Sequence, residues 1–194
     1  MKLVSFSVQN YRSLVKTKKL PIGDMTVLLG PNNEGKSNIL RAMVCAIRIV
    51  DTLDVAMIKR DGRIYFPNIG EQNFYRWEED FPISLQAANP DGNSIFTLEF
   101  SLMPEEVAEF KKEVKSNLNG TLPIEIHIGK TDPAFRVVKK GPGGKALSDK
   151  RVPIAKFIGK RFALEYFPTV RSANTAGKII ERMIARDLQQ AASR

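Results

Sequence analysis

The sequence has few of the residues that build covalent or metal-bound cores. It contains 194 residues with one cysteine, Cys45, and one histidine, His127. A lone cysteine cannot form an internal disulfide, and by itself it cannot hold a metal ion. His127 falls on the polar face of an alternating pattern at residues 124–128, where we expect neither a metal ligand nor a catalytic group. The sequence therefore argues against a disulfide scaffold.

Long apolar runs are also absent. No stretch approaches the roughly 18 apolar residues that a membrane-spanning helix needs, and the first residues lack the apolar core of a signal peptide. We therefore expect a cytoplasmic protein that has no membrane partner.

The overall composition is that of a folded domain, with 43% apolar and 26% charged residues. The length predicts a single domain over 1–194. The net charge of +9 is uneven, because residues 1–50 and 139–194 are basic and 51–103 are acidic. The basic ends fit a polyanion partner such as nucleic acid or a nucleotide, and they equally fit a polarised, solvated surface.

Hydrophobic periodicity predicts the main elements of an α/β fold. Within the range 1–60 we expect strands at 4–8 and 25–29, the second covered on both faces as in a parallel sheet, and a helix over 36–50. The range 78–140 is predicted to be rich in β-structure, with strands at 81–85, 94–102, 124–128 and 135–139 and a helix over 104–118. The range 160–194 is predicted to hold a last strand at 162–167 and a helical arm at 176–192. A further helical segment is expected from residue 154, and the weak pattern at 51–77 predicts helix end, loop and turn.

One motif carries specific chemistry. Gly30-Pro31-Asn32-Asn33-Glu34-Gly35-Lys36-Ser37 matches the pattern G-x-x-x-x-G-K-[ST] of a phosphate-binding loop, between an apolar run and an amphipathic helix. The glycines allow backbone N–H groups to surround a phosphate, and the start of the helix directs its positive end at the same anion. We expect ATP and Mg²⁺ as cofactors, with Lys36 as the catalytic residue on the phosphates and Ser37 as a metal ligand.

The residues around this loop carry a family resemblance. An Asn10-Tyr11-Arg12-Ser13 element precedes the loop by some twenty residues, and Asn38-Ile39-Leu40 follows it. This pair of motifs resembles the SMC/RecF branch of ABC-type ATPases, and more closely the overcoming-lysogenization-defect (OLD) family of ATP-dependent nucleases. The resemblance implies the N-terminal lobe of an ABC/SMC-like P-loop NTPase, with a mixed sheet around the loop strand and an antiparallel β subregion.

The resemblance also implies site residues. It places Arg12 beside the phosphates of the nucleotide and Asn33 on the rim of the loop. The expected nucleotide-binding set is therefore Arg12, Gly30, Pro31, Asn32, Asn33, Glu34, Gly35, Lys36, Ser37 and Asn38. Leu164 to Arg171 resembles a strand end of OLD-like proteins, but the glutamine that ABC folds place after this strand is replaced by Thr169 and Arg171, so Arg171 is only a weak site candidate.

Other motifs of such ATPases are missing from the sequence. We find no Walker B strand ending in Asp, no signature motif of the L-S-G-G type and no carboxylate cluster for a two-metal nuclease. We therefore expect 1–194 to be the N-terminal lobe of a longer ATPase, whose hydrolysis needs a C-terminal half or a partner.

Three functions remain open at this point. The favoured one is the ATP-binding head of a machine in DNA maintenance or phage defence, OLD-like, with a homodimer of heads, DNA and an attached nuclease domain or partner protein as its partners. The alternative is an interaction module that binds ATP without hydrolysis. A small P-loop kinase is less favoured, because Gly30 follows two extended segments. The basic loop 139–145 is either a solvated hairpin tip or a contact to a phosphate backbone.

Overall fold

The computed structural model describes residues 1–31, 35–51, 58–60, 63–65, 74–131, 133–138, 147, 149–167, 177 and 184. The chain divides into two compact units, Met1–Phe162 and Ala163–Arg194. The architecture below is that of the first unit. The predictions for the loop 139–145 and for Thr169 and Arg171 lie outside the described residues, as does nearly all of the helical arm 176–192.

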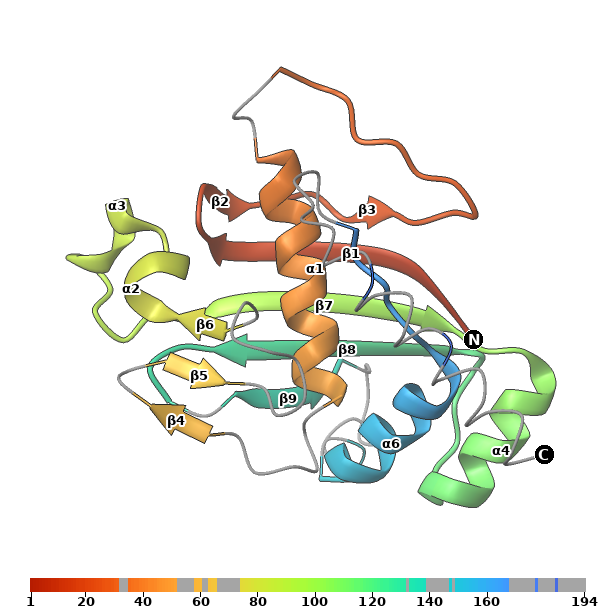
Figure 1. Ribbon diagram of the computed structural model, residues 1–194. Coiled ribbons are helices and arrows are strands. Elements are labelled where there is room, and N and C mark those ends of the chain that lie inside the picture. Colours follow the sequence, from red (N-terminus) through yellow and green to blue (C-terminus); the bar gives the residue numbers. More distant parts are fainter. Residues whose placement is uncertain are drawn as a thin grey trace. The chain divides into compact units, whose positions relative to one another are not determined.

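The first unit contains two antiparallel sheets (Figure 1). The larger sheet has the order β2-β1-β7-β8-β9, and β3 also pairs with β1. Its strands are β1 (Lys2–Tyr11), β2 (Leu14–Lys16), β3 (Leu20–Pro21), β7 (Ser94–Ser101), β8 (Thr121–Ile128) and β9 (Ala134–Val137). The smaller sheet has the order β4-β5-β6. Its strands are β4 (Ile58–Arg60), β5 (Arg63–Tyr65) and β6 (Phe74–Arg76). The predicted α/β class with an antiparallel region is confirmed. The mixed sheet expected around the loop strand is not seen among the described residues, whose strand pairs are all antiparallel.

Helices flank the larger sheet. They are α1 (Lys36–Asp51), α2 (Trp77–Asp80), α3 (Ile83–Gln86), α4 (Pro104–Val114) and α6 (Arg151–Arg161). Figure 1 shows α1 running across β1 and β7, which it contacts, and α6 packs against both α1 and α4. Among the described residues, no helix is long and apolar enough to cross a membrane.

The core of the unit lies on one face of β7 and β8. The register pairs Phe96 with Ile126 and Leu98 with Ile124, and all four side chains are fully buried. The alternating residues of both strands are only partly buried, which is the pattern expected when one face of an antiparallel sheet is covered. The period of two in the sequence therefore located these strands correctly.

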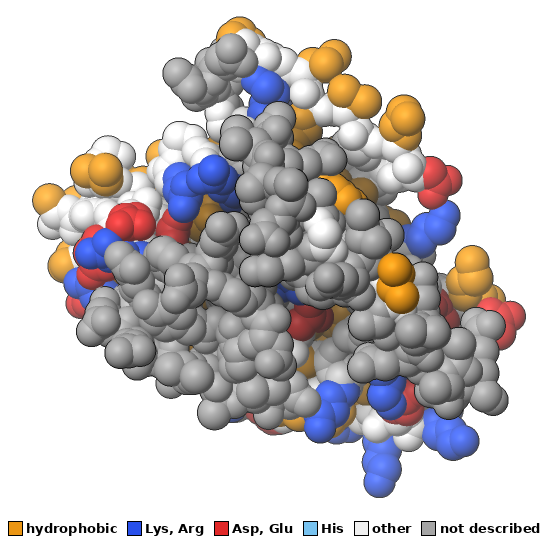
Figure 2. All heavy atoms as spheres, in the orientation of Figure 1, with side chains coloured by type: hydrophobic (Ala, Val, Ile, Leu, Met, Phe, Trp, Pro, Cys, Tyr) orange, Lys and Arg blue, Asp and Glu red, His pale blue; other side chains and the backbone are white. Residues whose placement is uncertain are grey.

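The segment before the phosphate-loop motif is not the buried strand that its apolar run predicts. Residues 25–29 form no strand, and the side chains of Met25, Val27 and Leu29 are 86%, 66% and 87% exposed. The segment extends away from α1 in Figure 1, and apolar side chains are visible along it in Figure 2. A strand needs a neighbour that offers backbone partners, and no described strand pairs with this segment. The predicted last strand at 162–167 is wrong for the same reason.

Two further expectations are corrected. Residues 81–85 contain the short helix α3 in place of a strand, because Pro82 cannot donate to a ladder and Phe81 turns inward to stack on Trp77, with ring centroids 5.2 Å apart. The range 51–77, predicted as helix end, loop and turn, contains the three short strands of the smaller sheet.

Helix α4 also ends earlier than predicted. Its last residue is Val114, and Lys115 has the left-handed conformation (φ 54°) that terminates a helix.

Candidate nucleotide-binding site

The phosphate-loop motif leads directly into α1, as the sequence predicts. Gly30 and Pro31 are described on one side of the loop and Gly35 on the other, whereas Asn32, Asn33 and Glu34 lie outside the described residues. Helix α1 begins at Lys36, and its first turn holds no acidic residue. The end of a helix that presents free N–H groups and no carboxylate favours an anion.

Gly35 is required at its position. Its φ is +87°, a conformation that side-chain-bearing residues rarely adopt, and a Cβ atom there would lie 2.8 Å from Leu14 Cδ2. The carbonyl of Gly35 accepts the first hydrogen bond of the helix from Ile39 N, at 2.8 Å. Gly35 is therefore packed tightly against the turn that joins β1 and β2.

The side chain of Lys36 forms hydrogen bonds with the first residues of the loop. Its Nζ donates to the carbonyl of Gly30 at 2.6 Å and to that of Pro31. A phosphate bound in the loop would offer stronger, charge-assisted acceptors to the same ammonium group. The next residue, Ser37, is exposed at the start of the helix, where its hydroxyl is available to a metal ion.

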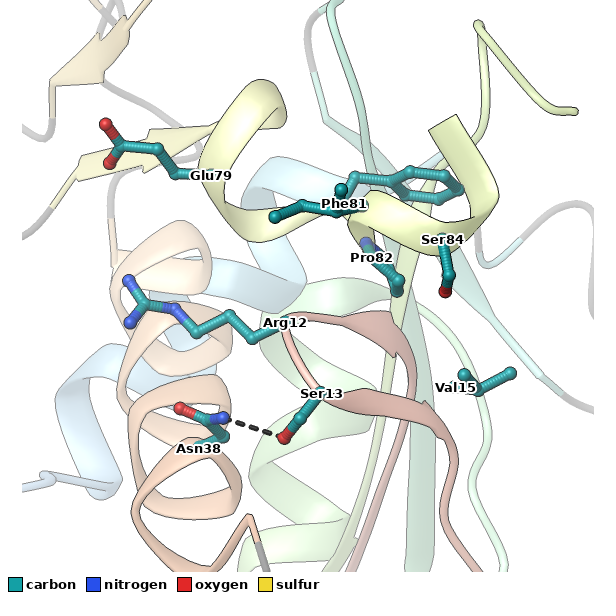
Figure 3. Close-up of a pocket in the computed structure, with 9 residues that line it drawn as sticks. Arg12, Ser13, Val15, Asn38, Glu79, Phe81, Pro82 and Ser84 are labelled. Atoms are coloured by element: carbon teal, nitrogen blue, oxygen red, sulfur yellow. Dashed lines mark hydrogen bonds between the residues drawn. The ribbon is translucent and has the colours of Figure 1, made fainter. Parts of the chain in front are cut away.

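The turn after β1 joins the loop region through a side-chain contact. Asn38 Nδ2 on α1 donates to Ser13 Oγ at 2.9 Å, and Figure 3 shows the two side chains pointing at each other. Arg12, Ser13 and Asn38 line one open cavity of about 510 Å³, whose remaining wall comes from Val15 and residues 79 and 81–84. The structure therefore brings together the two motifs that the sequence places some twenty residues apart.

Arg12 is held by a residue that the sequence analysis missed. Its Nε donates to Asp80 Oδ1 at 2.7 Å, and its backbone N–H donates to the carbonyl oxygen of Asp80 at 2.6 Å. Asp80 is buried on α2, 68 residues later in the chain, and no motif marks it. A buried carboxylate is rare without a partner, but the sequence alone does not show that Asp80 is buried.

Burial and neighbouring charges shift the pKa values of both Asp80 and Arg12. Burial raises the pKa of Asp80 above its ordinary value, and the backbone N–H of Arg76 and the charge of Arg12 only partly offset this. Burial lowers the pKa of Arg12, but the neighbouring Tyr11 and Asp80 raise it overall, so the guanidinium stays charged.

The other candidates from the sequence add no chemistry to this site. His127 lies within hydrogen-bonding distance of Glu125, with Nε2 2.5 Å from Oε1. Burial raises the pKa of Cys45, which leaves its thiol protonated and unreactive. The described residues contain no group of three or more His, Cys, Asp or Glu side chains placed to hold a metal ion.

Comparison with known proteins agrees with a nucleotide-binding site. Residues 1–48 match the family model described as an AAA ATPase domain. The chain is also 39% identical over 64 residues to the DNA replication and repair protein RecF of Anaeromyxobacter sp. (strain Fw109-5). That match covers 32% of this chain and 17% of the RecF protein. The family match thus covers Arg12, the loop and most of α1.

Proposed function

We propose that residues 1–194 form an ATP-binding lobe of an ATPase that acts in DNA metabolism. The observation that carries the proposal is the loop 30–37 at the start of α1. There Gly35 admits no side chain, and the ammonium group of Lys36 donates to two carbonyls of the loop. The match of residues 1–48 to an AAA ATPase domain supports ATP as the ligand. The likeness to RecF supports a role with DNA.

The residues present fit MgATP. Backbone N–H groups at the start of α1 would bind the β-phosphate, Lys36 the β- and γ-phosphates, and Ser37 the Mg²⁺ ion. Arg12 and Asn38 face the adjoining cavity and complete the proposed set. When bound, Mg²⁺ neutralises phosphate charge, and the chain holds the nucleotide in place.

We further propose that hydrolysis needs groups from a C-terminal half or a partner. The exposed side chains of Met25, Val27 and Leu29 support this, because an additional strand beside residues 25–29 would bury them. An OLD-like nuclease that works as a dimer of heads on DNA is the specific form we favour. The intact mass of the protein from its native cell tests whether a C-terminal half belongs to the same chain. A mass near 21.7 kDa contradicts such a half.

Replacing Lys36 tests ATP binding directly. We expect Lys36→Ala to weaken MgATP binding about 10- to 100-fold, since it removes a charge-assisted hydrogen bond to phosphate. Its thermal unfolding should match that of the unchanged chain, because the bonds of this side chain to described residues go to two carbonyls of the exposed loop. Lys112→Ala, which removes the same charge from the exposed face of α4, serves as the matched control and should bind normally. Equal affinities of Lys36→Ala and the unchanged chain, measured by calorimetry, would contradict the assignment.

A further inference from the structure

Asp80 engages Arg12 through both its backbone and its side chain. Arg12 lies in the turn after β1 with a left-handed backbone (φ 52°), and the carbonyl of Asp80 accepts the N–H of this strained residue. The carboxylate of Asp80 accepts Nε of the same residue. The first hydrogen bond therefore fixes the backbone of Arg12, and the second turns the Nε edge of its guanidinium toward Asp80.

The chemistry requires a carboxylate at position 80. Asp80 Oδ1 accepts from Arg12, and Oδ2 accepts from the backbone N–H of Arg76 at 2.8 Å. Both partners are donors, and the side chain is only 2% exposed, so water cannot replace either of them. An asparagine would satisfy one donor with its oxygen and turn its own NH₂ group toward the other.

Helix α2 provides a firm support for this carboxylate. The indole N–H of Trp77 donates to the carbonyl of Gly92 at 2.7 Å in a buried contact, and the Trp77 ring stacks on Phe81. A Cβ atom on Gly92 would lie 2.3 Å from the Phe81 ring, so the turn at 92 packs directly on the helix end. The aromatic contacts on both sides of Asp80 hold it in place.

Because Asp80 binds Arg12 through Nε, this hydrogen bond does not occupy Nη1 or Nη2. The side chain of Arg12 also interacts with the hydroxyl of Tyr11, so Asp80 and Tyr11 together orient the guanidinium. Tyr11 lies beneath it, with its ring centroid 5.6 Å from Cζ. Arg12 is 31% exposed and lines the cavity that it shares with Ser13 and Asn38, and Figure 3 shows its side chain extending alongside α1.

We propose that Asp80 is a positioning residue, which holds Nε of Arg12 so that Nη1 and Nη2 bind the phosphates of the nucleotide in the loop 30–37. This inference rests on the proposed function. It assigns Asp80 a role in ligand affinity in addition to the stability that a buried ion pair involves.

The direction of the change in MgATP affinity on replacing Asp80 separates a positioning role from a purely electrostatic one. Neutralising a carboxylate beside a polyanion site tightens binding if only charge matters, whereas loss of positioning weakens it. We expect Asp80→Asn to bind MgATP about tenfold more weakly. Glu78→Gln, on the same helix but paired with Arg76, removes the same charge and should change the affinity less than about twofold. In an Arg12→Ala background, Asp80→Asn should cause no further loss.

A second variant decides the matter if Asp80→Asn does not fold. Arg12→Lys keeps the charge and leaves Asp80 paired, but one ammonium group cannot bind both Asp80 and a phosphate as the two edges of a guanidinium do. We expect Arg12→Lys to lose about tenfold in MgATP affinity.

Three results would overturn the inference: tighter binding by Asp80→Asn, an equal loss in Glu78→Gln, or normal binding by Arg12→Lys. If Lys36→Ala loses binding while any of these is seen, the role of Asp80 alone fails. If Lys36→Ala binds normally, the proposed function fails and this inference fails with it.

Discussion

Two segments of the molecule have the same apolar spacing and opposite surroundings. In β8, Ile124, Ile126 and Ile128 recur at every second position and are fully buried. In the segment before the loop, Met25, Val27 and Leu29 recur at the same interval and are 66–87% exposed. The difference is the neighbour: β8 lies between β7 and β9, and no described strand pairs with residues 25–29.

The comparison shows that a period of two predicts the capacity to form a strand. The strand itself forms where other parts of the chain supply backbone partners and apolar cover. The exposed segment therefore carries side chains that suit a buried position, which agrees with the proposal that a further strand belongs beside it.

The largest expected effect tests the buried half of this comparison. Phe96→Ala should lower the free energy of unfolding by about 3–5 kcal/mol, because it leaves a cavity at a fully buried position between β1 and β8. Leu29→Ser, in the exposed segment, should change it by less than about 0.5 kcal/mol. Chemical denaturation measures both. A loss of several kcal/mol for Leu29→Ser would show that the segment is covered in solution.

An intermediate effect tests the contact between the loop and the hairpin. Gly35→Ala should cost about 1–3 kcal/mol, since it forces a Cβ into a left-handed residue and against Leu14. It should also weaken MgATP binding, because the loop must shift to admit the methyl group. Gly177→Ala, where a Cβ meets nothing within 4 Å, is the control and should have no such cost. Equal unfolding free energies of Gly35→Ala and the unchanged chain would contradict the tight packing.

The smallest effect concerns pH and the outer face of the sheet. The hydrogen bonds from Lys19 and Ser5 lower the pKa of Glu99, so its stabilising contribution is complete above the ordinary glutamate pKa and is lost as the pH falls through the lowered value. Glu99→Gln should therefore cost about 0.2–1 kcal/mol at pH 7 and almost nothing at pH 2. Unfolding curves at both pH values check this. An equal cost at the two values would show that the charge of Glu99 plays no part.

Much of the fold was predictable because local patterns and their partners lie in the same chain. The strands β1, β7, β8 and β9 and the helices α1, α4 and α6 follow from periodicity. The three short strands of the smaller sheet were missed because none is longer than three residues, too short for a period of two to be visible. Residues 81–85 were misassigned because the stacking of Phe81 on Trp77 is a tertiary contact that the local pattern does not contain.

The candidate site divides in the same way. The loop residues and Arg12 could be proposed from the sequence, because their spacing along the chain is itself the signal. Asp80 could not be proposed from the sequence, because its backbone and side-chain contacts are with a residue 68 positions away. Such a partner becomes visible only when the hairpin and α2 are seen side by side.

The packing of Gly35 divides the described part of the phosphate-loop motif into a covered side and an exposed side. On one side the loop meets Leu14 and Ser13 with no space for a methyl group, and this hairpin is part of the main sheet. On the other side it continues into residues 25–30, which are exposed apart from the half-buried Leu28. The strand that we propose beside Met25, Val27 and Leu29 would therefore cover the segment that leads directly into the nucleotide loop.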